Sequence, residues 1–189
     1  MTDNIELQVA TLSERAKTVA NEGNTTEAID LYREVARALV KEKRLSDLVM
    51  VLANLAKVDE TNTKAYLAQS TWLTMALGMP FQGLVTLFVA LFRTLPPDSH
   101  LVPLIGTTIV YCCSEYEEDS PQLEKYRELG MSILQVAAST QGIEEIEAFK
   151  AWFADRQLDD AEYFLPELME QLENLVGDTW LFDRTILDK

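Results

Sequence analysis

The chain has 189 residues with a formal net charge of −15, and 48% of its residues are hydrophobic. A chain of this length can bury a sizeable core, so we expect a single domain over residues 1–189. Its acidic surface repels phosphate backbones and anionic lipid heads, which disfavours nucleic acid and membrane surfaces as partners. The charge is typical of a soluble protein, and a basic partner surface is the alternative interpretation.

The cysteine content and the N-terminus favour a cytoplasmic location. The chain has two cysteines, the neighbours Cys112 and Cys113, whose adjacency would strain a disulfide. Residues 1–8 lack the positive and apolar regions of a signal peptide. The longest apolar run, Met75 to Phe92, falls short of the roughly 20 continuous apolar residues that a membrane span needs. Gly78, Pro80, Gln82 and Gly83 interrupt this run.

In chain order the sequence predicts nine helices and no strand, which indicates an all-α fold. Glycine and proline punctuate the predicted helices, and Ser120-Pro121 is typical of a helix start. We expect residues 1–4 to be flexible, residues 115–120 to form an acidic loop, and the apolar tail 177–189 to pack on the domain or on a partner. The predicted helices span residues 5–20, 25–41, 46 to the turn at 59–62, 63–77, 81–95, 101–115, 121–138, 143–154 and 159–176, the last with a possible kink or restart at Pro166.

The predicted helix from Phe81 to Leu95 has an unusually wide apolar surface. Its apolar side chains cover roughly 200° of the helix, whereas an ordinary surface helix needs a stripe of only about 100°. A narrow polar strip contains Gln82, Thr86 and Arg93. The wide surface is therefore covered either by this chain's own helices and tail, by a partner, or by a second copy of the chain.

Pairs of a small residue followed four positions later by a large one recur on alternate helices. Small residues at these positions would let the second helix of a pair approach the first closely. The spacing predicts paired helices one–two, three–four, five–six and seven–eight, with the ninth helix and the tail as a terminal cap. The pairs are Ala28 and Tyr32, Ala68 and Trp72, Gly106 and Val110, and Ala148 and Trp152, at spacings of 40, 38 and 42 residues.

The first pair of predicted helices resembles a tetratricopeptide repeat (TPR). The match covers about residues 9–37 and includes the run GNTTEAIDLYREV, and it becomes degenerate in later helices. The resemblance implies a TPR-like superhelix of αα-hairpins that binds a protein or peptide segment on its inner surface. It also implies that the first helix of each pair lines this concave surface, with Phe81 to Leu95 at its centre.

The resemblance directs attention to several candidate protein-binding residues. Many TPR proteins grip a terminal carboxylate with Lys, Arg and Asn, but here only scattered equivalents occur, so we do not predict a carboxylate clamp. A hydrophobic groove for an apolar or amphipathic segment fits better. The candidate residues are Phe81, Phe88 and Phe92 as apolar positions, Arg93, Lys17 and Asn21 as polar positions, and Trp180 and Phe182 in the tail.

The sequence offers little catalytic chemistry. His100 is the single histidine, so neither a histidine metal pair nor a relay can form, and a loop or capping role is expected. Burial should raise the pKa of both cysteines and make them inert. Acidic residues 155–162 are expected to cap a helix, with a cation site as the alternative. No phosphate-binding glycine motif occurs, so we expect no cofactor, no metal and no enzymatic activity.

Three classes of function follow from this reasoning. The first is a non-catalytic adaptor, assembly factor or chaperone-like protein that binds an apolar or amphipathic segment. The second is a structural homo-oligomer, such as a homodimer, that uses the apolar helix or the tail as its interface. The third is an enzyme on an all-α scaffold, which the preceding observations disfavour.

Overall fold

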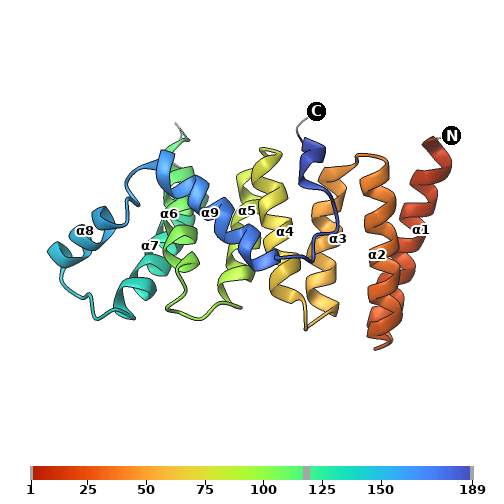
Figure 1. Ribbon diagram of the computed structural model, residues 1–189, viewed down its shortest axis with the longest axis horizontal. Coiled ribbons are helices and arrows are strands. Elements are labelled where there is room, and N and C mark those ends of the chain that lie inside the picture. The colour runs from red at the N-terminus through yellow and green to blue at the C-terminus, as the bar shows by residue number, and fades with distance from the viewer. Residues whose placement is uncertain (1, 117–119, 188–189) are drawn as a thin grey trace. The chain divides into compact units, whose positions relative to one another are not determined.

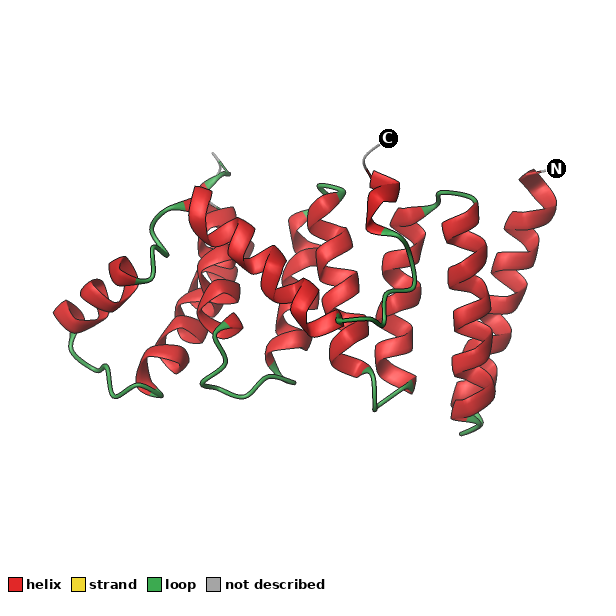
Figure 2. Cartoon of the chain, in the orientation of Figure 1, coloured by secondary structure: helices red, strands yellow, loops and turns green. Residues whose placement is uncertain are grey.

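The computed structural model describes residues 2–116 and 120–187, with side chains from residue 6 onward. Within these residues the chain is all-α: helix accounts for 78% of the residues and no strand is present (Figure 1 and Figure 2). The predicted fold class is confirmed. The described helices are α1 (Thr2–Asn21), α2 (Thr25–Lys41), α3 (Leu45–Val58), α4 (Thr63–Ala76), α5 (Phe81–Phe92), α6 (Leu101–Ser114), α7 (Pro121–Ser139), α8 (Ile146–Asp155), α9 (Ala161–Val176) and the short 3-10 helix η1 (Arg184–Leu187).

Local capping explains several helix ends. Gly23 adopts a φ of +83°, a left-handed conformation that favours glycine, and so ends α1. Ser120 caps α7, because its hydroxyl accepts a hydrogen bond from the amide of Leu123 at 3.2 Å. The helix α9 runs through Pro166 without a restart. In the described residues α1 begins at Thr2, earlier than predicted, whereas Met1 and the acidic residues 117–119 of the predicted loop lie outside this part of the chain.

By internal packing the chain divides into two compact units. The first unit contains the residues up to Leu87 together with those from Leu172 onward, and the second contains Phe88–Gln171. The divisions fall inside α5 and α9. The C-terminal segment is thus part of the same unit as the N-terminal helices, although about a hundred residues separate them in sequence.

In the first unit, neighbouring helices pack as successive hairpins. The helix α1 packs on α2, α2 on α3, and α3 on α4 (Figure 1). Ala28 and Ala68 are completely buried, as the small-residue spacing requires. The helix α4 is buried all round, since every residue from Tyr66 to Thr74 is less than 9% exposed. It is therefore the central helix of this unit.

In the second unit, α6 packs closely on α7. A Cβ atom on Gly106 of α6 would lie 2.9 Å from the carbonyl oxygen of Gly130 of α7. Gly106 thus permits a close approach, but towards the helix that follows it and not towards α5 as the predicted pairing required. The prediction is also wrong for Ala148, which is exposed on α8.

Candidate protein-binding surfaces

The apolar surface of α5 is covered within the fold. Phe88 has no exposed surface and Phe81 retains 6%, whereas Phe92 is half-buried. The predicted polar strip, which includes Thr86 and Arg93, is exposed. Phe81 and Phe88 are therefore core residues in this structure and do not offer a free surface to a partner.

The two polar candidates on the first helix are exposed. Lys17 forms an ion pair with Glu14, one turn away on α1, with 2.6 Å between Nζ and Oε1. This local hydrogen bond raises the pKa of Lys17. Asn21 is exposed at the end of α1. Neither side chain lines the groove on α7 and α8 that is described below.

The apolar tail packs on α4. We call residues 177–187 the C-terminal strap. Phe182 of the strap is 5% exposed and Trp180 is half-buried, and their ring centroids lie 6.1 and 5.4 Å from that of Trp72 on α4. The expectation that the tail packs either on the domain or on a partner is thus resolved in favour of the domain.

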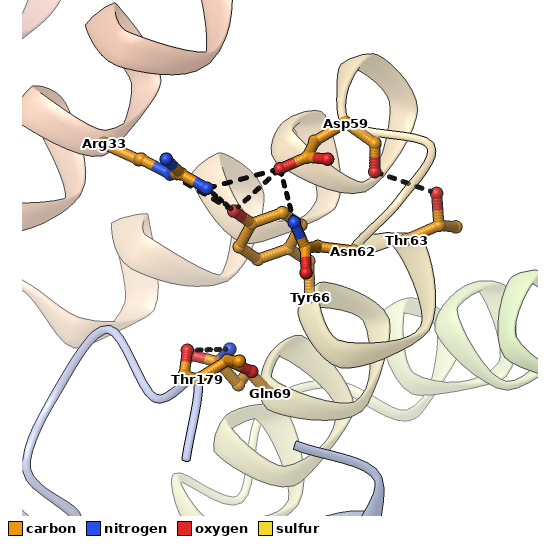
Figure 3. Close-up of polar contacts among 7 residues, drawn as sticks. All are labelled: Arg33, Asp59, Asn62, Thr63, Tyr66, Gln69 and Thr179. Carbon is orange, nitrogen blue, oxygen red and sulfur yellow. Dashed lines mark hydrogen bonds and ion pairs between the residues drawn. The ribbon is translucent and has the colours of Figure 1, made fainter. Parts of the chain in front are cut away.

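A polar cluster joins α2 to the turn between α3 and α4 (Figure 3). The Arg33 guanidinium donates to the hydroxyl of Tyr66 at 2.9 Å, and it lies 3.3 Å from the Asp59 carboxylate. That carboxylate also accepts hydrogen bonds from Tyr66 at 3.1 Å and from Asn62 at 3.0 Å. Burial raises the pKa of Tyr66 despite the opposing effect of Arg33.

This cluster is suited to holding the fold together. Asp59 is 7% exposed and Tyr66 is 3% exposed, so a substrate could not reach the reactive atoms of either side chain. The buried carboxylate is compensated by a cation and two further donors, as a buried charge requires. The cluster therefore fixes the α3–α4 turn against α2.

The two cysteines and the histidine, which the sequence analysis considered as reactive groups, take part in contacts within the fold. Burial raises the pKa of Cys112 to about 11 and also raises that of Cys113, as the sequence predicted. His100 is the N-cap residue of α6, and its ring is hydrogen-bonded to Glu167 on α9.

Among the described residues no group of three or more His, Cys, Asp or Glu side chains could hold a metal ion. Within that same part of the chain, no helix has both the length and the apolar character of a membrane span.

A groove lies between α7 and α8 in the second unit. The turn after α7 is closed by a hydrogen bond from the amide of Ile143 to the carbonyl of Ala138, at 3.1 Å. Gly142 takes the positive φ of 72° that this turn needs. The chain therefore reverses direction, and α8 begins at Ile146, three residues later than predicted.

One glutamine fixes the far end of α8 to this turn. The carbonyl oxygen of Gln141 accepts hydrogen bonds from the indole of Trp152 at 3.1 Å and from Arg156 at 2.9 Å. Arg156 also lies over the Trp152 ring, 5.1 Å from its centroid. Phe149 packs on Trp152 with 5.5 Å between ring centroids. These contacts hold an aromatic wall on the α8 side of the groove.

The groove has a volume of about 510 Å³, within the range of ligand pockets. Two of its apolar side chains are well exposed: Met131 at 46% and Ile146 at 64%. Burying such side chains against a partner stabilises a complex, and leaving them in water does not. The groove is lined by Met131, Ser132, Gln135, Ala138, Ser139, Ile143, Glu144, Ile146 and Phe149.

The charged side chain in the lining of the groove is acidic. Glu144 lines the groove, and Glu145 beside it is also exposed. The neighbouring cations are engaged locally, since Lys150 is paired with Glu147 at 2.9 Å and Arg156 is bonded to Gln141. Exposed apolar side chains beside exposed carboxylates suit a segment that carries both apolar and basic side chains.

The sequence prediction did not identify this groove. On α7 the buried residues are Gly130, Ile133, Leu134, Ala137 and Ala138, a regular helical stripe. Met131 and Val136 lie outside that stripe, and they are 46% and 38% exposed. Apolar residues off the buried stripe are the signal that could have indicated a binding surface.

Comparisons of the chain with protein-family models, with curated proteins and with solved structures find no match.

Proposed function

We propose that this chain is a non-catalytic protein-interaction module, an adaptor or assembly factor of the cytoplasm. In this proposal the α7–α8 groove binds a basic amphipathic segment of a partner protein. The observation that carries the proposal is the exposure of Met131 and Ile146, two apolar residues that line the groove. The TPR-like character of the first two helices is part of the same proposal.

Charge selects among the possible occupants of the groove. The exposed carboxylates beside it, together with the net charge of −15, attract lysine and arginine. A second copy of this chain would bring a surface of the same sign, which weakens self-association through this face. A basic amphipathic helix can bury the exposed apolar side chains and also pair with the carboxylates beside them. We therefore propose a heterologous protein segment, and treat a homodimer as an outcome to be tested.

A titration with a model peptide tests the proposal. The probe is a fluorescent amphipathic helix built from leucine and lysine, and the readout is fluorescence anisotropy. We expect Ile146→Glu to weaken binding by about tenfold, because interface positions of this kind are worth more than ~1 kcal/mol. The substitution adds a negative charge, so binding driven by charge alone would become tighter. Unchanged or tighter binding by Ile146→Glu would overturn the proposal.

The first unit offers a matched control for this variant. Met50 on α3 is 63% exposed, close to the exposure of Ile146, and it lies outside the lining of the groove. Met50→Glu adds the same charge and should leave apolar binding at the groove unchanged. Light scattering of the free protein at tens of micromolar completes the test. A dimer that dissociates when the peptide is added would favour self-association through this face.

A further inference from the structure

The side-chain amide of Gln69 holds the backbone of the C-terminal strap (Figure 3). Its oxygen accepts from the amide N–H of Leu181 at 2.9 Å, and its nitrogen donates to the carbonyl oxygen of Thr179 at 3.1 Å. Gln69 has no exposed surface. A buried amide needs such partners, and an extended backbone presents them whatever its sequence. Gln69 is therefore positioned to bind the backbone of the strap from Thr179 to Leu181.

Side chains of the strap add sequence selectivity. Here Trp180 and Phe182 both pack on Trp72, and their own centroids are 5.2 Å apart in an edge-to-face arrangement. Residue Arg184, two positions further on, lies over the Trp180 ring at 5.2 Å. The pattern that α4 accepts is thus Trp-x-Phe-x-Arg.

The receiving surface is organised by Glu173 of α9. Its carboxylate accepts a hydrogen bond from the indole of Trp72 at 3.1 Å, which fixes the ring that the strap covers. The same carboxylate forms an ion pair with Arg184 of the strap. One acidic side chain therefore orients the aromatic floor and also binds the basic end of the segment.

The strap is connected to α9 by a short exposed link. The helix ends at Val176, and Gly177 and Asp178 follow as exposed residues, with Gly177 at a φ of +56°. Gly177 thus ends the helix in the left-handed region, and the strap leaves α9 in a new direction and not as a continuation of the helix. Such a tether gives the strap an effective concentration of the order of millimolar at its own site.

We propose that α4 carries a peptide-binding site for segments of the Trp-x-Phe-x-Arg type, and that residues 179–184 are its intramolecular occupant. A partner segment of this chemistry binds when the strap is displaced. The site lies in the first unit and does not depend on the proposed function of the α7–α8 groove. The strap acts as a built-in competitor, so only a segment that outcompetes the tethered copy is bound.

Binding of a labelled peptide to the full-length chain tests this proposal. The probe is a synthetic peptide with the sequence of residues 178–184, and the readout is fluorescence anisotropy. The variant Trp180→Ala with Phe182→Ala weakens the tethered competitor but keeps the receptor residues Gln69 and Trp72. We expect this variant to bind the peptide at least tenfold more tightly than the wild-type chain. Adding Gln69→Leu should abolish the gain, and a peptide with both aromatic residues replaced by alanine should not bind.

The contrary outcomes are clear. A folded double variant that binds the peptide no better than wild type overturns the proposal. Loss of helical circular dichroism in that variant also overturns it, because the strap is then a permanent part of the core. Hydrogen exchange of the wild-type chain gives an independent measurement: the Leu181 amide should exchange faster than the amides of α4 through local opening. If the Leu181 amide and the amides of α4 both exchange only at the rate of global unfolding, the strap is not displaceable and the proposal is contradicted.

Discussion

Gly106 of α6 and Gly130 of α7 face each other so closely that a Cβ atom on either would lie 2.9 Å from the other's carbonyl oxygen. Backbone atoms cannot yield as flexible side chains do, so this contact requires glycine at both positions. It brings α7 against α6, and Met131, about 100° further around α7, lines the groove. The glycine pair is thus one basis of the candidate site.

Gly106→Ala should destabilise the protein in spite of alanine's better helix propensity. Overpacking of a tight contact typically costs about 1–3 kcal/mol, which exceeds the gain of up to ~1 kcal/mol from replacing a helical glycine. Denaturant unfolding followed by circular dichroism measures the difference. Gly83→Ala is the matched control: Gly83 is also helical, but a Cβ there meets nothing within 4 Å, so this variant should be stabilised or unchanged. Equal stability of the two variants would contradict the contact.

Phe88→Ala should strongly destabilise the protein, because Phe88 is completely buried. Truncation of a buried phenylalanine typically costs about 3–5 kcal/mol through lost burial and the cavity that remains. Phe92→Ala, at a half-buried position of the same helix, should cost less. Thermal unfolding of the two variants provides the comparison. A Phe88→Ala protein as stable as wild type would show that α5 is not a core helix.

Tyr66→Phe should cost about 1 kcal/mol, because it removes the hydroxyl that links Arg33 to Asp59. The variant should also lose less stability than the wild-type chain as the pH becomes alkaline. Burial raises the pKa of Tyr66 above its ordinary value of 10.0, so its contribution is complete below that pH and disappears as the pH rises through the folded-state pKa. Urea unfolding at several pH values measures both effects. Tyr163→Phe is the control, since Tyr163 is 57% exposed, and an equal effect there would refute the role of the cluster.

Cys112 should be a slow nucleophile near neutral pH. Burial raises its pKa from 9.0 to about 11, so the thiolate fraction at pH 8 falls by about 100-fold. In a Cys113→Ala variant, the rate of reaction with a chromogenic disulfide reagent should keep rising between pH 9 and pH 11. A rate that levels off near pH 9 would mean that Cys112 is accessible and unperturbed. Because the pKa is raised by folding, the thiol's contribution to stability is present below about pH 9 and is lost as the pH approaches 11.

The helices could be predicted from the sequence because their signals are local. Gly23, Pro80 and Ser120-Pro121 mark helix ends through backbone geometry that needs no tertiary context. The pairing of α6 with α7 could not be predicted in the same way. The small residue Gly106 indicates a close approach but does not say which neighbour approaches.

The binding surfaces were harder to predict than the helices. Gln69 lies among Ser70, Thr71 and Thr74 on α4, and all four are buried. The partner of the Gln69 amide is Thr179 of the strap, 110 positions away, which no local pattern reveals. Phe81 and Phe88 were correctly recognised as residues of a widely contacted helix, but the sequence did not distinguish a core from a groove.

The proposed function depends on whether the α7–α8 groove selects basic amphipathic segments. The most direct measurement is a selection from a random peptide display library on the immobilised wild-type chain, repeated on the Ile146→Glu variant. We predict that wild type enriches peptides combining leucine-like and basic residues at helical spacing, and that Ile146→Glu loses this enrichment while Met50→Glu retains it. Enrichment of the same peptides by wild type and Ile146→Glu, or no enrichment by wild type, would contradict the account.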